Sequence, residues 1–289
     1  MLNPVILTAL MFTAASPDSS IKEKISREFS SAQGTFALAF KDLQTGEEIL
    51  INERETFHAA STMKTPVMIE VYKQAAAGKF ALSDSVTIHQ NFKSIADGSE
   101  YILDQESDSD QDLYKLKGSK MDIYGLLYRM IIRSSNLATN MIIELAGAKN
   151  VNQTMRDIGA HDIQVLRGVE DIRAYEKGLN NTTNAYDQML IYTALANGKI
   201  AGIESTRPMI NILLKQEFNE VIPARLPKEV QVAHKTGSIT GIQHDAGIVY
   251  LPDGRKYVLV LLSKDLKDEK EGKAVMSRVS EMVYNMLMR

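Results

Sequence analysis

Three short clusters of residues in this chain combine a nucleophilic hydroxyl, amines and groups that bind anions. In the first cluster, Ser61 and Lys64 are three positions apart, so on a helix they lie on one face within reach of each other. The N-terminus of that helix supplies free backbone N–H groups and a positive field, which favour an oxyanion. A neighbouring lysine can take the hydroxyl proton where the site lowers the pKa of its amine. Alone, the spacing is a weak signal, because Ser19 and Lys22 repeat it at another helix start.

The second and third clusters add a hydroxyl, a carboxamide and another cation. Ser134 and Asn136 lie between two helical runs, where both side chains can point into one cleft, although a helix N-cap has the same pattern. Lys235, Thr236, Gly237 and Ser238 lie at the end of a predicted strand. A cation, a hydroxyl and a glycine that lets a ligand lie close to the strand suit recognition of a carboxylate, although an ordinary edge strand has the same sequence.

The hydrophobic pattern predicts the elements that position these clusters. Apolar residues at spacings of three and four predict helices at 21–29, 62–76, 121–132, 137–145, 151–158, 185–196, 205–214 and 271–288, and strands are predicted at 35–40, 48–52, 230–234, 246–251 and 257–262. The sequence therefore predicts an α+β fold, with one antiparallel sheet built from both chain ends, flanked by helices, and an inserted all-helical lobe. We expect 17–60 with 203–289 to form the α/β lobe and 61–202 the helical lobe, together one catalytic domain.

The composition excludes several classes of protein. The 289 residues are 44% hydrophobic and 24% charged, with 33 basic and 36 acidic side chains and a net charge of -3, as in ordinary globular proteins. This balance argues against nucleic-acid binding, and no apolar run reaches the roughly 18 residues of an integral membrane segment. Cysteine is absent, which excludes disulfides, thiolate metal sites and cysteine nucleophiles.

Residues 1–16 are interpreted as a signal peptide for export. The run is apolar and ends in small residues, which predicts cleavage near Ala15. The basic residue that normally precedes the apolar run is missing, so a buried first helix or strand is the alternative.

Other catalytic and metal-binding patterns are not found. The chain has no Gly-x-Ser-x-Gly elbow, no zinc-binding HExxH and no phosphate loop, and its five histidines lack metal-ligand spacing. A histidine-based triad is compatible with the sequence, because triad partners are distant in a chain, but no pattern favours it. The acidic segment 104–112 is interpreted as a solvated loop, with a rim contact or an ion site as alternatives.

In their order and context, the three clusters resemble the motif set of class A β-lactamases and penicillin-binding proteins. The flanking residues agree with the class A pattern: Phe57 and Ala60 before Ser61, the run 136–140, the run 181–183 and the pair 226–227. The resemblance covers the chain from about Ile21 to Arg289.

The resemblance implies a catalytic role for four residues. Ser61 would be the nucleophile that forms an acyl-enzyme with a β-lactam or a related acyl compound. Lys64 and Ser134 would transfer protons, Ser134 toward the leaving nitrogen. The backbone N–H groups of Ser61 and Ser238 would form the oxyanion hole.

The resemblance also implies the groups that bind substrate. Asn136 would hold the side-chain amide of the substrate, and Lys235 and Thr236, beside Gly237, would hold its carboxylate. His244 is a further candidate for the carboxylate, without support from a motif. This chemistry needs no metal and no organic cofactor.

Two positions depart from the class A pattern. Ser135 replaces an acidic residue that mainly organises the turn in the family, a change that we expect to be tolerated. The loop that should carry the glutamate for deacylation has Glu170 one residue too far from Arg167, and Ala174 stands where the pattern has asparagine. Glu170 is the best candidate for the general base and Asp171 competes with it. Alternatively, both are surface carboxylates of a loop that no longer positions water.

The resemblance implies a bacterial serine β-lactamase of class A type that acts in antibiotic resistance, and residues 1–16 predict that it is exported, periplasmic or secreted. Its partner would be a small β-lactam or acyl-peptide substrate, and we expect a monomer. The alternatives are a cell-wall D-Ala-peptidase or esterase of the same fold, or a penicillin-binding sensor that is acylated without turnover.

Overall fold

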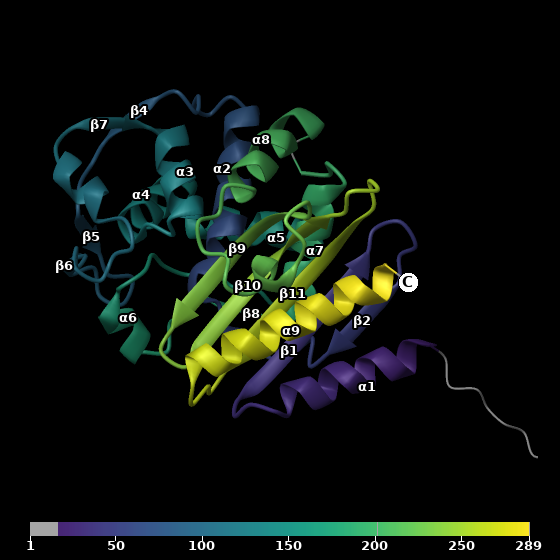
Figure 1. Cartoon of the computed structure of the whole chain (residues 1–289). Helices are drawn as coiled ribbons and strands as arrows, with labels where there is room; N and C mark the ends of the chain where they lie inside the picture. Colours follow the sequence, from purple (N-terminus) through teal and green to yellow (C-terminus); the bar gives the residue numbers. More distant parts are fainter. Residues whose placement is uncertain (1–16, 201, 289) are drawn as a thin grey trace, which may run out of the picture.

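A computed structural model describes residues 17–200 and 202–288 of the chain. It consists of a central sheet, with two helices on one face and a larger group of helices on the other (Figure 1). The predicted signal peptide at 1–16 lies outside the described residues. Within those residues, none of the helices combines the length and apolar character that crossing a membrane requires.

The central sheet contains five antiparallel strands drawn from both ends of the chain, which confirms the predicted α+β class. In spatial order they are β2 (Glu48–Ile51), β1 (Thr35–Asp42), β11 (Lys256–Lys264), β10 (Ile242–Tyr250) and β9 (Gln231–Ile239). Ala39 pairs with Val260 where the N-terminal and C-terminal strands meet. The middle strand β11 has a continuous apolar run because helices cover both faces of the sheet. The β9 strand forms one edge.

Two terminal helices cover one face of this sheet, α1 (Pro17–Phe29) and α9 (Glu269–Leu287), drawn in purple and yellow in Figure 1. Val275, Val279 and Val283 of α9 recur at a spacing of four and are buried against the sheet. Phe29 of α1 stacks on Phe36 of β1 with ring centroids 5.0 Å apart. These contacts join the two ends of the chain in one core.

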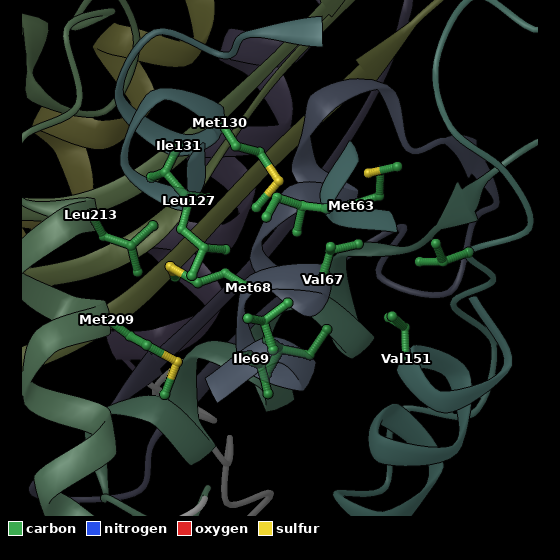
Figure 2. Packing of buried hydrophobic residues seen from close by; sticks show 14 of the residues in the cluster. Met63, Val67, Met68, Ile69, Leu127, Met130, Ile131, Val151, Met209 and Leu213 are labelled. Atoms are coloured by element: carbon green, nitrogen blue, oxygen red, sulfur yellow. The ribbon is translucent and has the colours of Figure 1, made fainter. Parts of the chain in front are cut away.

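The helices on the other face surround α2, which is buried on nearly all sides. They are α2 (Lys64–Ala76), α3 (Ile123–Ile132), α4 (Asn136–Ala146), α5 (Ala148–Asp157), α7 (Ala185–Ala196) and α8 (Ile203–Leu213). Figure 2 shows Val67, Met68 and Ile69 of α2 packed among side chains of α3, α5 and α8. The helix that carries Lys64 is thus fixed by a second apolar core. The predicted boundary between residues 202 and 203 would assign α7 to the helical lobe and α8 to the α/β lobe. However, α7 contacts the central sheet, and α8 contacts α2 and α3 as well as β9. The boundaries of the two lobes therefore stay a prediction.

Several short elements were not predicted. They are β3 (Phe57–His58), β4 (Ser85–Thr87), β5 (Asn91–Lys93), β6 (Glu100–Ile102), β7 (Lys120–Asp122), β8 (Thr182–Thr183), α6 (Ile172–Glu176) and the 3-10 turns η1 (Ala60–Met63), η2 (Gln111–Leu116) and η3 (Pro223–Arg225). The β3–β8 pair matters most for the site, because it joins the segment before Ser61 to the segment after residue 181.

Candidate active site

Ser61 lies in the 3-10 turn η1, which runs directly into α2, so the predicted helix start is confirmed with a tighter first turn. The preceding residue, Ala60, has a left-handed φ of 44°. The edge strand β9 passes close by, because a Cβ on Gly237 would lie 3.2 Å from the Ser61 backbone nitrogen. The strand predicted at 230–234 extends to Ile239, so 235–238 form the last part of β9. As a result, the strand that carries Lys235 lies alongside the turn that carries Ser61.

Lys64 is fully buried beneath this turn and donates three hydrogen bonds. Its Nζ donates to the Ser134 carbonyl oxygen at 2.7 Å, to Ser134 Oγ at 3.1 Å and to Asn136 Oδ1 at 3.3 Å. Within the described residues, Lys64 Nζ donates no hydrogen bond to Ser61 Oγ. Burial lowers the pKa of Lys64 to about 7, although the charges of Asp108 and Glu170 oppose this shift. An amine with that pKa can exchange a proton near neutral pH.

Ser134 lies between two buried lysines. Lys235 Nζ donates to Ser134 Oγ at 3.1 Å and to the Thr236 carbonyl oxygen at 2.9 Å. Desolvation, and next the charge of Lys64, hold the pKa of Lys235 well below its usual range. The backbone of Ser134 has a left-handed φ of 57°, uncommon for a residue with a side chain. This conformation places the hydroxyl where it contacts both amines.

The turn between α3 and α4 is held by residues of the acidic segment. Ser135 is the N-cap of α4, because its side chain accepts a hydrogen bond from the Ala138 N–H. Asp108 accepts hydrogen bonds from the N–H groups of Asn136 and Leu137, and its side chain is buried. The interpretation of 104–112 as a solvated loop is therefore wrong for its middle, because the first turn of α4 supplies unpaired N–H groups that attract a carboxylate.

Glu170 faces Asn136 across the site. Its Oε1 accepts a hydrogen bond from Asn136 Nδ2 at 2.8 Å, and its Oε2 accepts one from the Asp104 N–H at 3.0 Å. The residue has a left-handed φ of 60°. Glu170, Ser61, Asn136 and Ser238 line a cavity of about 370 Å³. The carboxylate is thus within the site, despite the extra residue between it and Arg167.

Asp171 does not share this position. Its two carboxylate oxygens accept hydrogen bonds from Ser94 Oγ, from the Ile95 N–H and from the Ala174 N–H, and the side chain is 1% exposed. Asp171 is the N-cap of α6 and ties the loop to the segment at 94–95. Geometry therefore favours Glu170 over Asp171 as the general base. Ala174 is buried and supplies no side-chain amide near Glu170.

Asn140 of α4 fastens the loop that carries Glu170. Its Oδ1 accepts a hydrogen bond from the Val169 N–H at 2.7 Å, and its Nδ2 donates to the Val169 carbonyl oxygen at 3.1 Å. Gly168 makes this approach possible, because a Cβ at that position would lie 2.3 Å from Asn140 Oδ1. Arg167 anchors the start of the loop by donating to the carbonyl oxygen of Leu179.

We expect Gly168→Ala to loosen this fastening. The added methyl group overlaps a buried, short side chain that has little room to move, so the free energy of unfolding should fall by about 1–3 kcal/mol. Urea unfolding measures this loss. Asn140→Ala removes the overlapping atoms, so adding Gly168→Ala to that variant should cost much less. Equal losses in both backgrounds would contradict the steric explanation.

Two buried histidines, His234 and His244, are held by partners within the fold. His244 is 1% exposed, its Nε2 lies 2.9 Å from the His58 carbonyl oxygen, and burial lowers its pKa to about 4. It is neutral near pH 7, so the proposal that it binds a carboxylate is not supported. His234 is also 1% exposed, and its Nδ1 lies 2.8 Å from Asp245 Oδ1.

A second cavity of about 480 Å³ adjoins the first and shares Ser61, Asn136 and Ser238 with it. Thr236 of β9 and Lys273 of α9 also line it. Lys273 is a cation that the sequence analysis missed, because it lies in the helix that closes the chain and belongs to no motif. Within 17–200 and 202–288, no group of three acidic or histidine side chains has the geometry to hold a metal ion.

Comparison with known proteins agrees with this arrangement. The model of the β-lactamase enzyme family matches residues 20–287. A β-lactamase from Bacteroides uniformis is 26% identical over 172 residues, which is 55% of this chain and 58% of that relative. The chain therefore matches less than two thirds of the length of this relative.

Solved structures extend the similarity to nearly the whole fold. A β-lactamase from Sphaerobacter thermophilus has a TM-score of 0.78 and 26% identity, covering 93% of this chain and 97% of that one. A mutant of PBP-A, in an acyl-enzyme complex with penicillin G, has a TM-score of 0.79 and 26% identity over the same shares. Since the family model spans nearly the entire sequence and the architecture agrees with it, this chain has the β-lactamase fold and belongs to the β-lactamase enzyme family.

Proposed function

We propose that this protein is a serine β-lactamase of class A type, which opens the β-lactam ring through an acyl-enzyme on Ser61 and then hydrolyses that intermediate. One observation supports this most directly: the Lys64 amine, with a pKa of about 7, and the Glu170 carboxylate are joined through the amide of Asn136 beside Ser61. Lys64 serves the acylation half of the reaction and Glu170 the deacylation half, and hydrogen bonds to Asn136 connect the two.

In the acylation half, Ser61 Oγ attacks the lactam carbonyl carbon while its proton passes to the neutral amine of Lys64. The negative charge on the carbonyl oxygen is stabilised by the backbone N–H groups of Ser61 and Ser238. The ring C–N bond then breaks, and the leaving nitrogen takes a proton from Ser134 Oγ. Because Ser134 Oγ contacts both amines, Lys64 can return the proton to it.

Substrate binding is assigned to groups around the same cleft. Lys235 and Thr236 bind the substrate carboxylate, and Gly237 lets the substrate lie close to β9. Asn136 holds the side-chain amide of the substrate. Lys273 lines the cavity beside Thr236 and replaces His244 as the further cation for the carboxylate.

In the deacylation half, Glu170 takes a proton from a water molecule, which attacks the ester carbonyl carbon and releases Ser61. The bond between Glu170 Oε1 and Asn136 supports this role, because it fixes the carboxylate in the cavity that Ser61 lines. We further propose export to the periplasm or the medium, a monomeric state and a role in antibiotic resistance.

A second candidate function shares the acylation step. Ala174 offers no amide to orient a water molecule beside Glu170, and the similar PBP-A mutant carries a penicillin G acyl group. These observations favour a penicillin-binding sensor, or a D-Ala-peptidase or esterase, in which the β-lactam adduct persists.

The test is a time course with a chromogenic cephalosporin, run beside Ser61→Ala, with intact-mass measurement of the same samples. Ser61→Ala removes the nucleophile, so we expect it to lose more than about 10³-fold in turnover and to gain no adduct. Sustained turnover by the wild type supports the β-lactamase. One burst with a lasting adduct supports the second candidate, and no adduct with no turnover contradicts both β-lactam functions.

A further inference from the structure

Asp108 makes an unusually complete set of hydrogen bonds for a residue in an acidic loop. Its side chain is 3% exposed, and its Oδ2 accepts from the Asn136 N–H at 3.0 Å, the Leu137 N–H at 2.9 Å and the Tyr114 hydroxyl at 3.0 Å. Its Oδ1 accepts from the Asp110 N–H at 3.0 Å. A carboxylate that accepts four hydrogen bonds is fixed in position.

These bonds act on the first turn of α4, which carries a side chain of the site. The N–H groups of Asn136 and Leu137 lie in the first turn of α4, where no carbonyl oxygen of the helix is available to accept their hydrogen bonds. The side chain of Ser135 accepts the hydrogen bond from the next N–H group, that of Ala138. The positive end of α4 therefore faces the Asp108 carboxylate. No acidic residue lies within the Ser134–Asn136 turn itself, so the carboxylate that accepts from these two backbone N–H groups comes from a segment 28 residues away.

The neighbours of Asp108 fasten the same turn from its other side. Asp110 accepts two hydrogen bonds of 2.8 Å from Arg129 of α3, and Ser109 Oγ donates to the Arg133 carbonyl oxygen at the end of that helix. Segment 108–110 thus contacts both helices that flank Ser134. A left-handed φ of 57° at Ser134 costs energy, and such a conformation persists where the surrounding contacts hold it.

We propose that Asp108 is a positioning residue for catalysis: its carboxylate holds the backbone of Asn136 so that the side-chain amide of Asn136 bridges Lys64 and Glu170. The role rests on the proposed β-lactam function, because its kinetic effect is on acylation of Ser61. Asp108 lines neither of the two cavities at Ser61, so it acts through Asn136.

The charge of Asp108 also predicts a pH effect. The ionisable groups that act on Lys64 are Asp108, Glu170 of the loop before α6, and Lys235 of β9. Asp108 and Glu170 raise the pKa of Lys64 against the effect of burial. Removing the Asp108 charge should therefore lower the pKa of Lys64, and the acid limb of the acylation rate should move to lower pH.

The experiment measures acylation by a chromogenic cephalosporin across pH for Asp108→Asn, Asp108→Glu and Asp112→Asn. Asp108→Asn should slow acylation about 10²-fold, since a small misplacement of a catalytic group has that effect, and should move the acid limb to lower pH. Asp108→Glu keeps the charge and displaces the oxygens, so it should slow acylation and leave the limb in place. Asp112 is exposed and paired with Lys115, so Asp112→Asn is the matched control, and its acylation rate should stay within twofold of the wild-type rate.

Amide hydrogen exchange separates this inference from the proposed function. In Asp108→Asn, the N–H groups of Asn136 and Leu137 should exchange faster than in the wild type, whether or not a β-lactam reacts. Acylation of Asp108→Asn within threefold of the wild type, with an unmoved limb, would overturn the proposal. If the wild type is not acylated, the proposed function fails, and unchanged exchange at these two amides would overturn the positioning role as well. If Asp108→Asn does not fold, the rate and exchange of Asp108→Glu decide.

Discussion

Replacing Glu170 with glutamine is expected to stop the reaction at the acyl-enzyme. Glutamine keeps the size of the side chain and one accepting oxygen, which can retain the hydrogen bond from Asn136 or the one from Asp104, but it cannot take a proton from water. General base catalysis contributes about 10²–10⁴-fold, so steady-state turnover of a cephalosporin should fall about 10³-fold. In the proposed mechanism acylation depends on Lys64, so its rate above the acid limb should change much less, while the limb itself should move to lower pH because the Glu170 charge no longer raises the pKa of Lys64.

Two readouts of Glu170→Gln identify the step that is lost. Stopped-flow absorbance should show a burst of one equivalent per enzyme, and intact mass should show the adduct lasting for the whole measurement. Glu176→Gln, an exposed carboxylate in α6 of the same loop region, is the control and should keep wild-type turnover. Turnover by Glu170→Gln at the wild-type rate, without adduct, would show that another group activates the water.

Replacing Lys64 with methionine should have the largest effect on acylation. Methionine fills much of the same buried space and removes the amine that contacts Ser134 Oγ and Asn136 Oδ1. Without a group to take the Ser61 proton, acylation should fall about 10³-fold or more. The wild-type acylation rate should rise with pH through about 7, because the neutral amine is the active form. A pH-independent wild-type rate would contradict this role.

The same variant tests the buried charge through stability. The pKa of Lys64 is 10.5 in its ordinary state and about 7 in the fold. Below pH of about 7, both states are protonated and the cost of burying the charge is complete. As the pH rises toward 10.5, the unfolded chain holds the extra proton, so the wild type gains stability, by up to about 1.4 kcal/mol per pH unit.

Lys64→Met has no amine to titrate at this position, so its stability should not rise in this way. The free energy of unfolding of the wild type minus that of Lys64→Met should therefore increase between about pH 7 and about pH 9. Urea unfolding of both proteins at several pH values measures it. Lys79→Met, at an exposed position beyond the end of α2, controls for the loss of a lysine and should track the wild type. A difference that stays constant with pH would mean that Lys64 keeps an ordinary pKa in the fold.

The sequence predicted the long elements well because their signals are local. The apolar spacing in α2, α7 and α9 and the apolar runs of the central strands follow from burial of one face or of both. Pairs such as β3–β8 have two residues per strand, and contacts between segments more than a hundred residues apart hold them in place. No local pattern carries that information.

The site shows the same division between motif residues and their supports. The three clusters meet as predicted, with Lys64 and Lys235 both on Ser134 Oγ. The support from Asp108 was missed because an acidic run predicts exposure, and its burial depends on donors in a distant helix end. The sequence held one indication of this support: Ser135 stands where the class A pattern has an acidic residue, so a carboxylate for this turn has to come from elsewhere in the chain.

Three residues with a left-handed φ belong to the proposed site: Ala60 precedes the proposed nucleophile, Ser134 is the proposed proton relay, and Glu170 lies in the loop proposed for deacylation. Each conformation costs of order 1–3 kcal/mol, while a whole domain is stable by only about 5–15 kcal/mol. The two apolar cores must offset this cost, which leaves a narrow margin for sequence drift. The tolerance of this protein to mutation therefore depends on residues far from Ser61. Substitutions that stabilise the cores should allow destabilising changes among the cavity-lining residues. A destabilised core should make the same changes unfold the protein, even where the chemistry would tolerate them.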